Sequence, residues 1–162
     1  MNRFLIPAVG LAVIGLLVAG MLFLNRGSRV VLNGEIKKVR THEADEKSSV
    51  AIIDFRFANP ARYPLVVRSV EVILEGQAGS QPVAGAVVAD MDAKRFLDAY
   101  PDLGPKFNDS LKVRDKIAPG TADDRMIAAR FEVPVTELNR RKRFRIVVLD
   151  VDGAVSELAE KQ

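Results

Sequence analysis

Cysteine is absent from the 162 residues, and histidine occurs only once. The lack of cysteine excludes disulfides, thiolate metal sites and thiol nucleophiles. The single histidine, His42, leaves a Ser-His-Asp type of site with at most one candidate base, and no paired carboxylates indicate a catalytic cleft. We therefore expect no enzyme and no cofactor. The 24 Lys and Arg residues nearly balance the 21 Asp and Glu residues, so a nucleic-acid partner is not expected either.

Charge is absent from one long stretch, the 21 residues from Phe4 to Leu24. A helix needs about 20 apolar residues to cross the hydrocarbon core of a bilayer. The stretch therefore predicts a single transmembrane helix after a leader of residues 1–3. Cleavage as a signal peptide is the alternative, with Val18-Ala19-Gly20 as the candidate site, but the run continues to Leu24 and favours an uncleaved signal-anchor. Met21 stands where a lipoprotein carries its lipidated cysteine, which excludes that modification.

Two opposing arguments bear on the orientation of this helix. Basic residues are more numerous after it than before it, and the positive-inside rule then places the C-terminal domain in the cytoplasm. Long domains, however, translocate largely regardless of their charge. A very short leader before the apolar run is also typical of exported, anchored domains. We expect the C-terminal domain on the extracytoplasmic side of the membrane, either periplasmic or extracellular.

Small residues recur on one face of the predicted transmembrane helix, at Ala8, Ala12, Gly15 and Ala19. Such a stripe lets a second membrane helix approach closely. It is therefore a candidate contact for a protein partner or for a second copy of the chain. The alternative is that it only reflects the usual abundance of alanine and glycine in membrane helices.

After a polar linker at residues 25–28, residues 29–162 have the pattern of a β domain. Apolar and charged residues alternate from Ser49 to Ala58, which predicts a half-buried antiparallel strand with Asp54 and Arg56 on its polar face. Further runs predict strands at residues 29–40, 63–74, 82–89, 111–117, 127–133, 144–151 and 154–158. Because no βαβ alternation occurs, these strands predict an antiparallel immunoglobulin-like β-sandwich.

Local signals refine this pattern. We expect a bulge at Arg68-Ser69, a helical turn at residues 135–141 and a hairpin turn at Asp152-Gly153. The polar segments 41–49 and 118–124 are expected to be loops or turns.

One short helix is expected near residues 91–100, capped by Asp90 or Asp92 and stopped by Pro101. Its apolar stripe consists of Ala93, Phe96, Leu97 and Tyr100. The simplest interpretation is a lid over one end of the core. The alternative is that the stripe lines a ligand pocket between the helix and the sheet.

The most concentrated charge is a basic patch that consists of Arg140, Arg141, Lys142, Arg143 and Arg145. It is a candidate site for anionic lipid headgroups or for an acidic partner. The alternative is a solvated surface whose charge only aids solubility.

Two acidic segments are weaker candidates for metal binding. Asp150 and Asp152 faintly resemble a calcium loop but lack its spacing, so a hairpin turn explains them better. His42 is followed by Glu43, Asp45 and Glu46, but with no second histidine this is more simply a solvated loop. No metal site is therefore expected.

A family resemblance rests on the segment from Phe57 to Val67, followed by Ser69–Val72 and Val83-Ala84. This segment resembles the WHy-domain (water stress and hypersensitive response) family of late-embryogenesis-abundant proteins, in which a strand ends at Asn-Pro and the chain turns back through Pro. Ala118-Pro119-Gly120 and Phe131–Val135 resemble the later part of that family. The resemblance covers residues 50–155 and is interrupted by an insertion near residues 90–116. It implies a single β-sandwich with one helix, no enzymatic activity, and a role in stress protection or at the envelope.

The sequence thus predicts a non-catalytic, membrane-anchored β-sandwich for protein or envelope interaction, with stress protection implied by the resemblance. The alternative is an accessory subunit of a membrane complex that docks through its transmembrane helix.

Overall fold

The computed structural model describes residues 31–161. The predicted leader, transmembrane helix and linker, together with the small-residue stripe, lie outside these residues. Within the described part of the chain, no helix has both the length and the apolar character that crossing a membrane requires.

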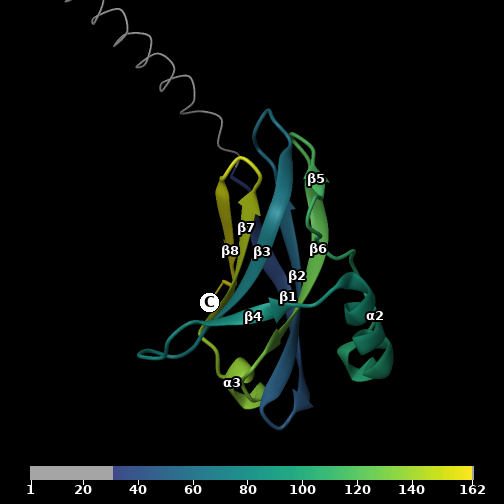
Figure 1. Ribbon diagram of the computed structural model, residues 1–162, viewed down its shortest axis with the longest axis vertical. Coiled ribbons are helices and arrows are strands. Elements are labelled where there is room, and N and C mark those ends of the chain that lie inside the picture. Colours follow the sequence, from purple (N-terminus) through teal and green to yellow (C-terminus); the bar gives the residue numbers. More distant parts are fainter. Residues whose placement is uncertain (1–30, 162) are drawn as a thin grey trace, which may run out of the picture.

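The described residues form a mainly β structure in which every pair of named strands is antiparallel (Figure 1). The strands are β1 (Asn33–Asp45), β2 (Ser48–Ala58), β3 (Leu65–Glu75), β4 (Val83–Val87), β5 (Lys116–Ile117), β6 (Ala122–Phe131), β7 (Arg143–Asp150) and β8 (Val155–Ala159). The helices are α2 (Asp90–Ala99), the 3-10 turn η1 (Pro101–Leu103) and α3 (Val135–Asn139). Hydrogen bonds connect the strands in the order β1-β2-β6-β4-β3-β7-β8, with β5 beside β3.

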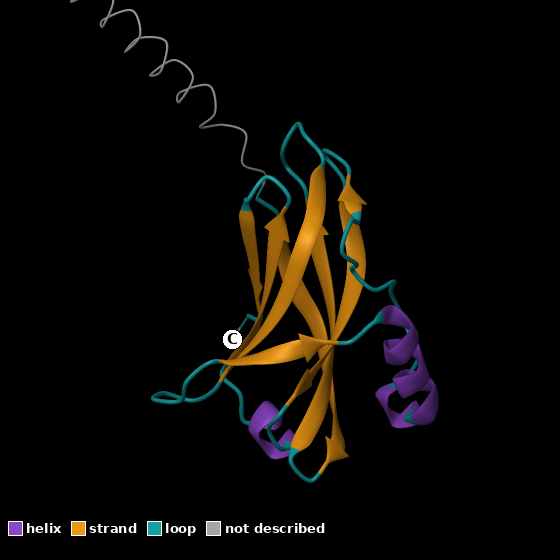
Figure 2. Cartoon of the chain, in the orientation of Figure 1, coloured by secondary structure: helices purple, strands orange, loops and turns teal. Residues whose placement is uncertain are grey.

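Strand β4 divides this order into two facing halves, which makes the structure a β-sandwich. Its first part, Val83–Gly85, pairs with β3, and its second part, Ala86–Val87, pairs with β6. Figure 2 shows β4 running across the direction of the long strands. On the opposite side, the residue before β1 reaches β8, because the amide of Leu32 donates a hydrogen bond to Ser156 Oγ at 2.8 Å. The β-sandwich prediction is therefore confirmed.

The main core lies between the two halves and is rich in phenylalanine. Phe55 and Phe57 from β2 pack with ring centroids 5.9 Å apart, and Phe131 of β6 meets Phe144 of β7 at 5.6 Å. All four side chains are at most 1% exposed. The contact between β6 and β7 joins the two halves, since these strands are not neighbours in the hydrogen-bonded order.

Strand β2 is buried on both faces, which corrects the half-buried prediction. Every residue from Ser48 to Phe55 is buried. The expected apolar face points into the main core, but the other face packs under α2, where Val50 and Ile52 form a second cluster with Ala93 and Leu97. The predicted lid therefore covers the outer face of a sheet and not one end of the core.

The loop predicted at residues 41–49 is wrong. Strand β1 continues to Asp45, β2 begins at Ser48, and His42 pairs with Val50 within the ladder. The turn is short because the Asp45 carboxylate accepts hydrogen bonds from the Lys47 amide and the Ser48 hydroxyl. Residues 41–49 are polar because much of this hairpin faces solvent. Their polarity does not indicate a lack of regular structure.

Other boundaries differ in similar ways. Residues 122–124, predicted as a turn, begin β6 and pair with the end of β2. The strand predicted at residues 111–117 is reduced to Lys116–Ile117. The predicted helix forms, but its N-cap residue is Ala89, without a side-chain cap.

Three local predictions are confirmed. The β3–β7 register shifts between Val67 and Ser69, as expected for a bulge. The helical turn forms as α3. Gly153 has a φ of 82°, which suits the predicted hairpin between β7 and β8 because glycine adopts this conformation without strain.

The long axis of the sandwich has two distinct ends. The hairpin end contains the β7–β8 turn at residues 151–154 and the β2–β3 loop at residues 59–64, and the described chain begins there with Val31 (Figure 1). The α3 end contains α3, the β1–β2 turn and the β3–β4 loop.

Candidate interaction surfaces

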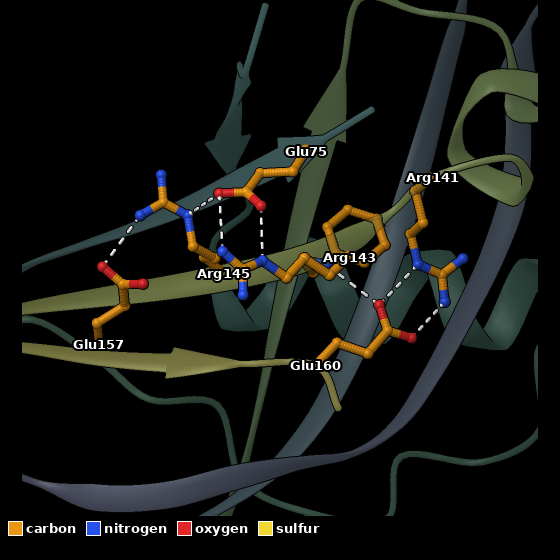
Figure 3. Close-up of polar contacts among 7 residues, drawn as sticks. Glu75, Arg141, Arg143, Arg145, Glu157 and Glu160 are labelled. Atoms are coloured by element: carbon orange, nitrogen blue, oxygen red, sulfur yellow. Dashed lines mark hydrogen bonds and ion pairs between the residues drawn. The ribbon is translucent and has the colours of Figure 1, made fainter. Parts of the chain in front are cut away.

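The predicted basic patch lies at the α3 end, where the chain leaves α3 and enters β7. Figure 3 shows that carboxylates from two other strands and the C-terminal segment meet it. Arg141 donates to both oxygens of Glu160, at 2.8 and 2.7 Å. Arg143 Nε and Arg145 Nε each lie 2.6 Å from a Glu75 oxygen.

These pairs neutralise much of the patch. Arg145 also reaches Glu157 at 3.0 Å. The hydrogen bond from Arg143 lowers the pKa of Glu75 and outweighs the opposing effect of desolvation, so this carboxylate stays charged. Among residues 31–161, Arg140 and Lys142 are the members of the patch that form no ion pair. Binding of anionic lipid or an acidic partner here stays a prediction.

The acidic hairpin residues serve the fold. The Asp150 carboxylate is buried and accepts hydrogen bonds from the amides of Val66 at 2.9 Å and Val151 at 2.8 Å. This agrees with the interpretation of the segment as a hairpin turn. Across the described range 31–161, no group of three or more His, Asp or Glu side chains is placed to hold a metal ion.

A buried ion pair that the sequence did not reveal fixes the inserted segment to the sheet. Arg40 of β1 and Asp54 of β2 meet at 2.7 Å with side chains 6% and 7% exposed. Arg40 Nη1 also donates to the carbonyls of Leu103 and Pro105, and Asn108 Nδ2 donates to Asp54. The sequence showed only that Asp54 interrupts the apolar run from Val50 to Phe55, and alternation assigned it to the solvent face.

His42 adds an aromatic contact to the same segment. Its ring centroid lies 4.0 Å from that of Tyr100 and 5.9 Å from that of Phe96. Its Nδ1 lies 3.2 Å from an Asp102 carboxylate oxygen. His42 therefore helps to hold the C-terminal part of α2 and η1 against β1.

The start of α2 is held by charge. Asp90 accepts a hydrogen bond from Lys106 Nζ at 2.6 Å and lies 3.2 Å from Lys112 Nζ. The hydrogen bond from Lys106 is the largest cause that lowers the pKa of Asp90, with Ser110 and Lys112 contributing. The acid expected to cap the helix instead ties its first turn to the segment that follows it.

Two concave regions flank the insertion. A cavity of about 290 Å³ lies between α2 and the sheet and is lined in part by Ala44, Val50, Ala93 and Phe96. This is the place where the sequence allowed a ligand pocket. A second cavity, of about 500 Å³, adjoins Ser69 and Val70 of β3, where β3 pairs with neither β4 nor β5.

No protein-family model and no curated protein matches the chain. Among solved structures, the archaellum periplasmic stator protein FlaG from Sulfolobus acidocaldarius is 11% identical, with 80% of this chain and 99% of that chain covered at a TM-score of 0.33. The complex of FlaF and FlaG from the same organism aligns at 12% identity, covering 79% and 86%, with a TM-score of 0.32. An uncharacterized β-sandwich protein from Clostridium difficile 630 aligns at 10% identity, covering 83% and 91%, with a TM-score of 0.40.

Proposed function

We propose that this chain is a non-catalytic interaction domain held at a membrane surface by residues 4–24. The observation that carries the proposal is where the chain joins the sandwich. The described chain begins at the hairpin end, and the uncharged 21-residue stretch ends at Leu24. Residues 25–30 can span at most about 20 Å when fully extended. An anchor at residues 4–24 therefore holds the hairpin end near the bilayer and leaves the α3 end directed away from it.

The anchor is tested by charging it. The double substitution Leu16→Arg with Leu17→Arg places two cations at the middle of the stretch, and each costs about 3 kcal/mol at the centre of a membrane helix. We expect the wild-type chain to stay with membranes after an alkaline wash and the variant to be released. The exposed pair Arg140→Glu and Lys142→Glu serves as the control. Release of the wild-type chain would contradict the proposal.

The proposed location of the domain is extracytoplasmic, since long domains translocate largely regardless of flanking charge. A reporter that is active only outside the cytoplasm, fused after Gln162, is expected to be active. A complementary fusion whose reporter functions only in the cytoplasm should be silent, and the reverse pattern would overturn the assignment.

An accessory subunit of a membrane complex is the second candidate, and the small-residue stripe favours it. Gly15→Leu with Ala19→Leu places two bulky side chains on the stripe and so prevents a second helix from approaching closely. Loss of a co-purified partner in this variant, with the partner retained by the control Leu11→Ala, would support docking through the helix. Partner retention in the Gly15→Leu and Ala19→Leu variant would reject it.

The finer fold assignment is also part of the proposal. The strand order β1-β2-β6-β4 with β3-β7-β8 supports an immunoglobulin-like arrangement, because it corresponds to strands ABED and CFG of that fold. The WHy-domain resemblance and the stress-protective role that it implies stay proposals. The test is deletion of this protein from its host. Unchanged survival of desiccation and osmotic stress would contradict the stress-protective role.

A further inference from the structure

The hairpin end gathers basic residues that are far apart in the sequence. Lys116 of β5 pairs with Val66 of β3, and the Arg114 amide donates to the carbonyl of Val67 at 2.7 Å. Arg68 lies within β3, at the bulge next to Val67, and Arg62 lies in the preceding β2–β3 loop. The fold therefore brings four cations from two separate segments to the same end of the sandwich.

These four cations are available to a partner. The side chains of Arg62, Arg68, Arg114 and Lys116 are exposed, and none forms an ion pair with any residue in the range 31–161. The basic patch at the α3 end differs, because three of its five cations are held by Glu75, Glu157 and Glu160.

The acids near this surface are not ion-paired with its cations. The Asp115 carboxylate accepts the amide of Lys112 at 2.9 Å, and Asp150 is buried in the hairpin. Asp123 and Asp124 pair with Arg125 and Arg56. Two further acids, Asp152 in the hairpin and Glu71 along β3, are exposed at its borders. Within residues 31–161, none of these acids forms an ion pair with the four cations, so the guanidinium and ammonium groups remain free to contact lipid phosphates.

Exposed apolar side chains accompany these cations. Tyr63 is 61% exposed, Val113 is 60% exposed, and Val151 is 49% exposed. The amide of Val151 donates to the carbonyl of Val66 at 3.0 Å, which places Val151 beside the strand pair that carries Lys116. Tyrosine among basic residues is typical of surfaces at the membrane interface, where an apolar ring and a polar group are both accommodated.

We propose that this surface, made of Arg62, Tyr63, Arg68, Arg114, Lys116 and Val151, rests on anionic lipid headgroups. The inference rests on the proposed membrane anchor, because residues 25–30 keep this end within about 20 Å of the stretch that ends at Leu24. Each cation held near an anionic bilayer favours the docked state about fivefold. The basic patch at the α3 end cannot contact the same bilayer surface. The 8 residues of β7, about 25 Å long, separate that patch from the hairpin end.

The absence of tryptophan from the chain allows a direct test. Full-length chains carrying Tyr63→Trp, or Thr136→Trp in α3 as the matched control, are reconstituted into phosphatidylcholine vesicles with and without phosphatidylglycerol. A lipid spin-labelled at its headgroup is the quencher. We expect quenching of the tryptophan at position 63 in anionic vesicles, weaker quenching in neutral ones, and little quenching at position 136. High salt should reverse the effect, since it shortens the screening length to about 3 Å at 1 M.

Charge reversal gives the second arm. In the Tyr63→Trp background, Arg68→Glu with Lys116→Glu should lower the docked-to-undocked ratio at least about 25-fold, at about fivefold for each lost cation. The control pair Arg140→Glu with Lys142→Glu should leave it unchanged. If the first pair prevents folding, judged by circular dichroism, Arg62→Glu in the loop replaces it.

The outcomes separate the two proposals. A chain that does not float with vesicles overturns the membrane anchor, and this surface with it. A chain that floats but shows equal quenching at positions 63 and 136, or equal quenching in neutral and anionic vesicles, overturns the lipid surface alone. A response of the tryptophan at position 63 to soluble polyglutamate but not to anionic vesicles would make the partner an acidic protein and would also overturn it.

Discussion

Arg40 and Asp54 form an ion pair in which both charges are withdrawn from water. A buried pair adds little stability beyond a well-packed apolar pair, but removing one partner leaves an uncompensated buried charge. The pair also supplies hydrogen bonds to the segment after α2 through Leu103 and Pro105. Loss of the pair should therefore destabilise the inserted segment as well as β1 and β2.

Asp54→Ala should lower the free energy of unfolding by about 3–5 kcal/mol, since it strands the Arg40 guanidinium. Chemical denaturation of the full chain in detergent, followed by circular dichroism, measures this. Asp124→Ala is the matched control, because its pair with Arg56 is exposed and should contribute less than about 1 kcal/mol. Equal losses in the two variants would show that burial of the pair is unimportant.

Gly85 occupies the point where β4 passes from one half of the sandwich to the other. A Cβ atom at this position would lie 2.6 Å from the Phe131 ring. Gly85→Ala should therefore cost about 1–3 kcal/mol of stability through overpacking. In a Phe131→Leu background the cost should shrink, and a thermal-unfolding double-mutant cycle measures that coupling. Additive losses would mean that the contact with Phe131 is not the cause.

The insertion that carries α2 is the element most dependent on side-chain contacts. Its helix packs on the outer face of β2 through Ala93 and Leu97. Polar contacts at Asp90, His42 and Arg40 hold the rest of it. Its backbone hydrogen bonds to the sheet lie after the helix, at Asp109, Leu111, Arg114 and Asp115. We therefore expect residues 90–103 to open more readily than the sandwich itself.

Acid should loosen the start of α2 through Asp90. The folded pKa of Asp90 is lowered from its ordinary value of 3.8, mainly by the hydrogen bond from Lys106. The stabilisation is therefore complete above 3.8 and is lost as the pH falls toward the lowered pKa. The protection of residues 90–103 against hydrogen exchange, relative to the unfolded chain at the same pH, should fall over that range in the wild-type chain. Asp90→Asn should exchange faster at neutral pH with a flatter acid response, whereas Asp92→Asn should resemble wild type.

At the scale of the whole molecule, the two ends of the sandwich are chemically different. The hairpin end carries cations without partners among residues 31–161, and the α3 end carries a basic segment that is largely paired. If residues 4–24 are the anchor, this difference sets which end meets the lipid and which remains accessible.

Single-cysteine labelling can measure that accessibility, because the chain has no cysteine of its own. On membrane-bound chains, Asp152→Cys at the hairpin end should react more slowly with a bulky maleimide than Lys47→Cys at the β1–β2 turn. Solubilisation in detergent should make the two rates similar. Slower labelling at position 47 would reverse the proposed orientation of the sandwich.

Alternation identified most strands because it reports local burial, and β2, β3 and β7 lie close to where their patterns placed them. The apolar stripe of α2 was readable for the same reason. What local pattern could not show was how far the polar hairpin around His42 extends as strand, since cross-strand pairing and not side-chain polarity maintains that ladder. Nor could it show that the outer face of β2 is covered.

The sequence by itself determined that residues 31–161 form an antiparallel β domain with one amphipathic helix, because two-residue and helical periodicities act over short distances. It also determined the charge-free stretch from Phe4 to Leu24. Only the tertiary structure decided which charges remain available. Glu75 meets Arg143 across 68 residues of chain, and Lys116 reaches β3 only through the pairing of β5. Charge neutralisation depends on the register between distant strands, which local sequence does not encode.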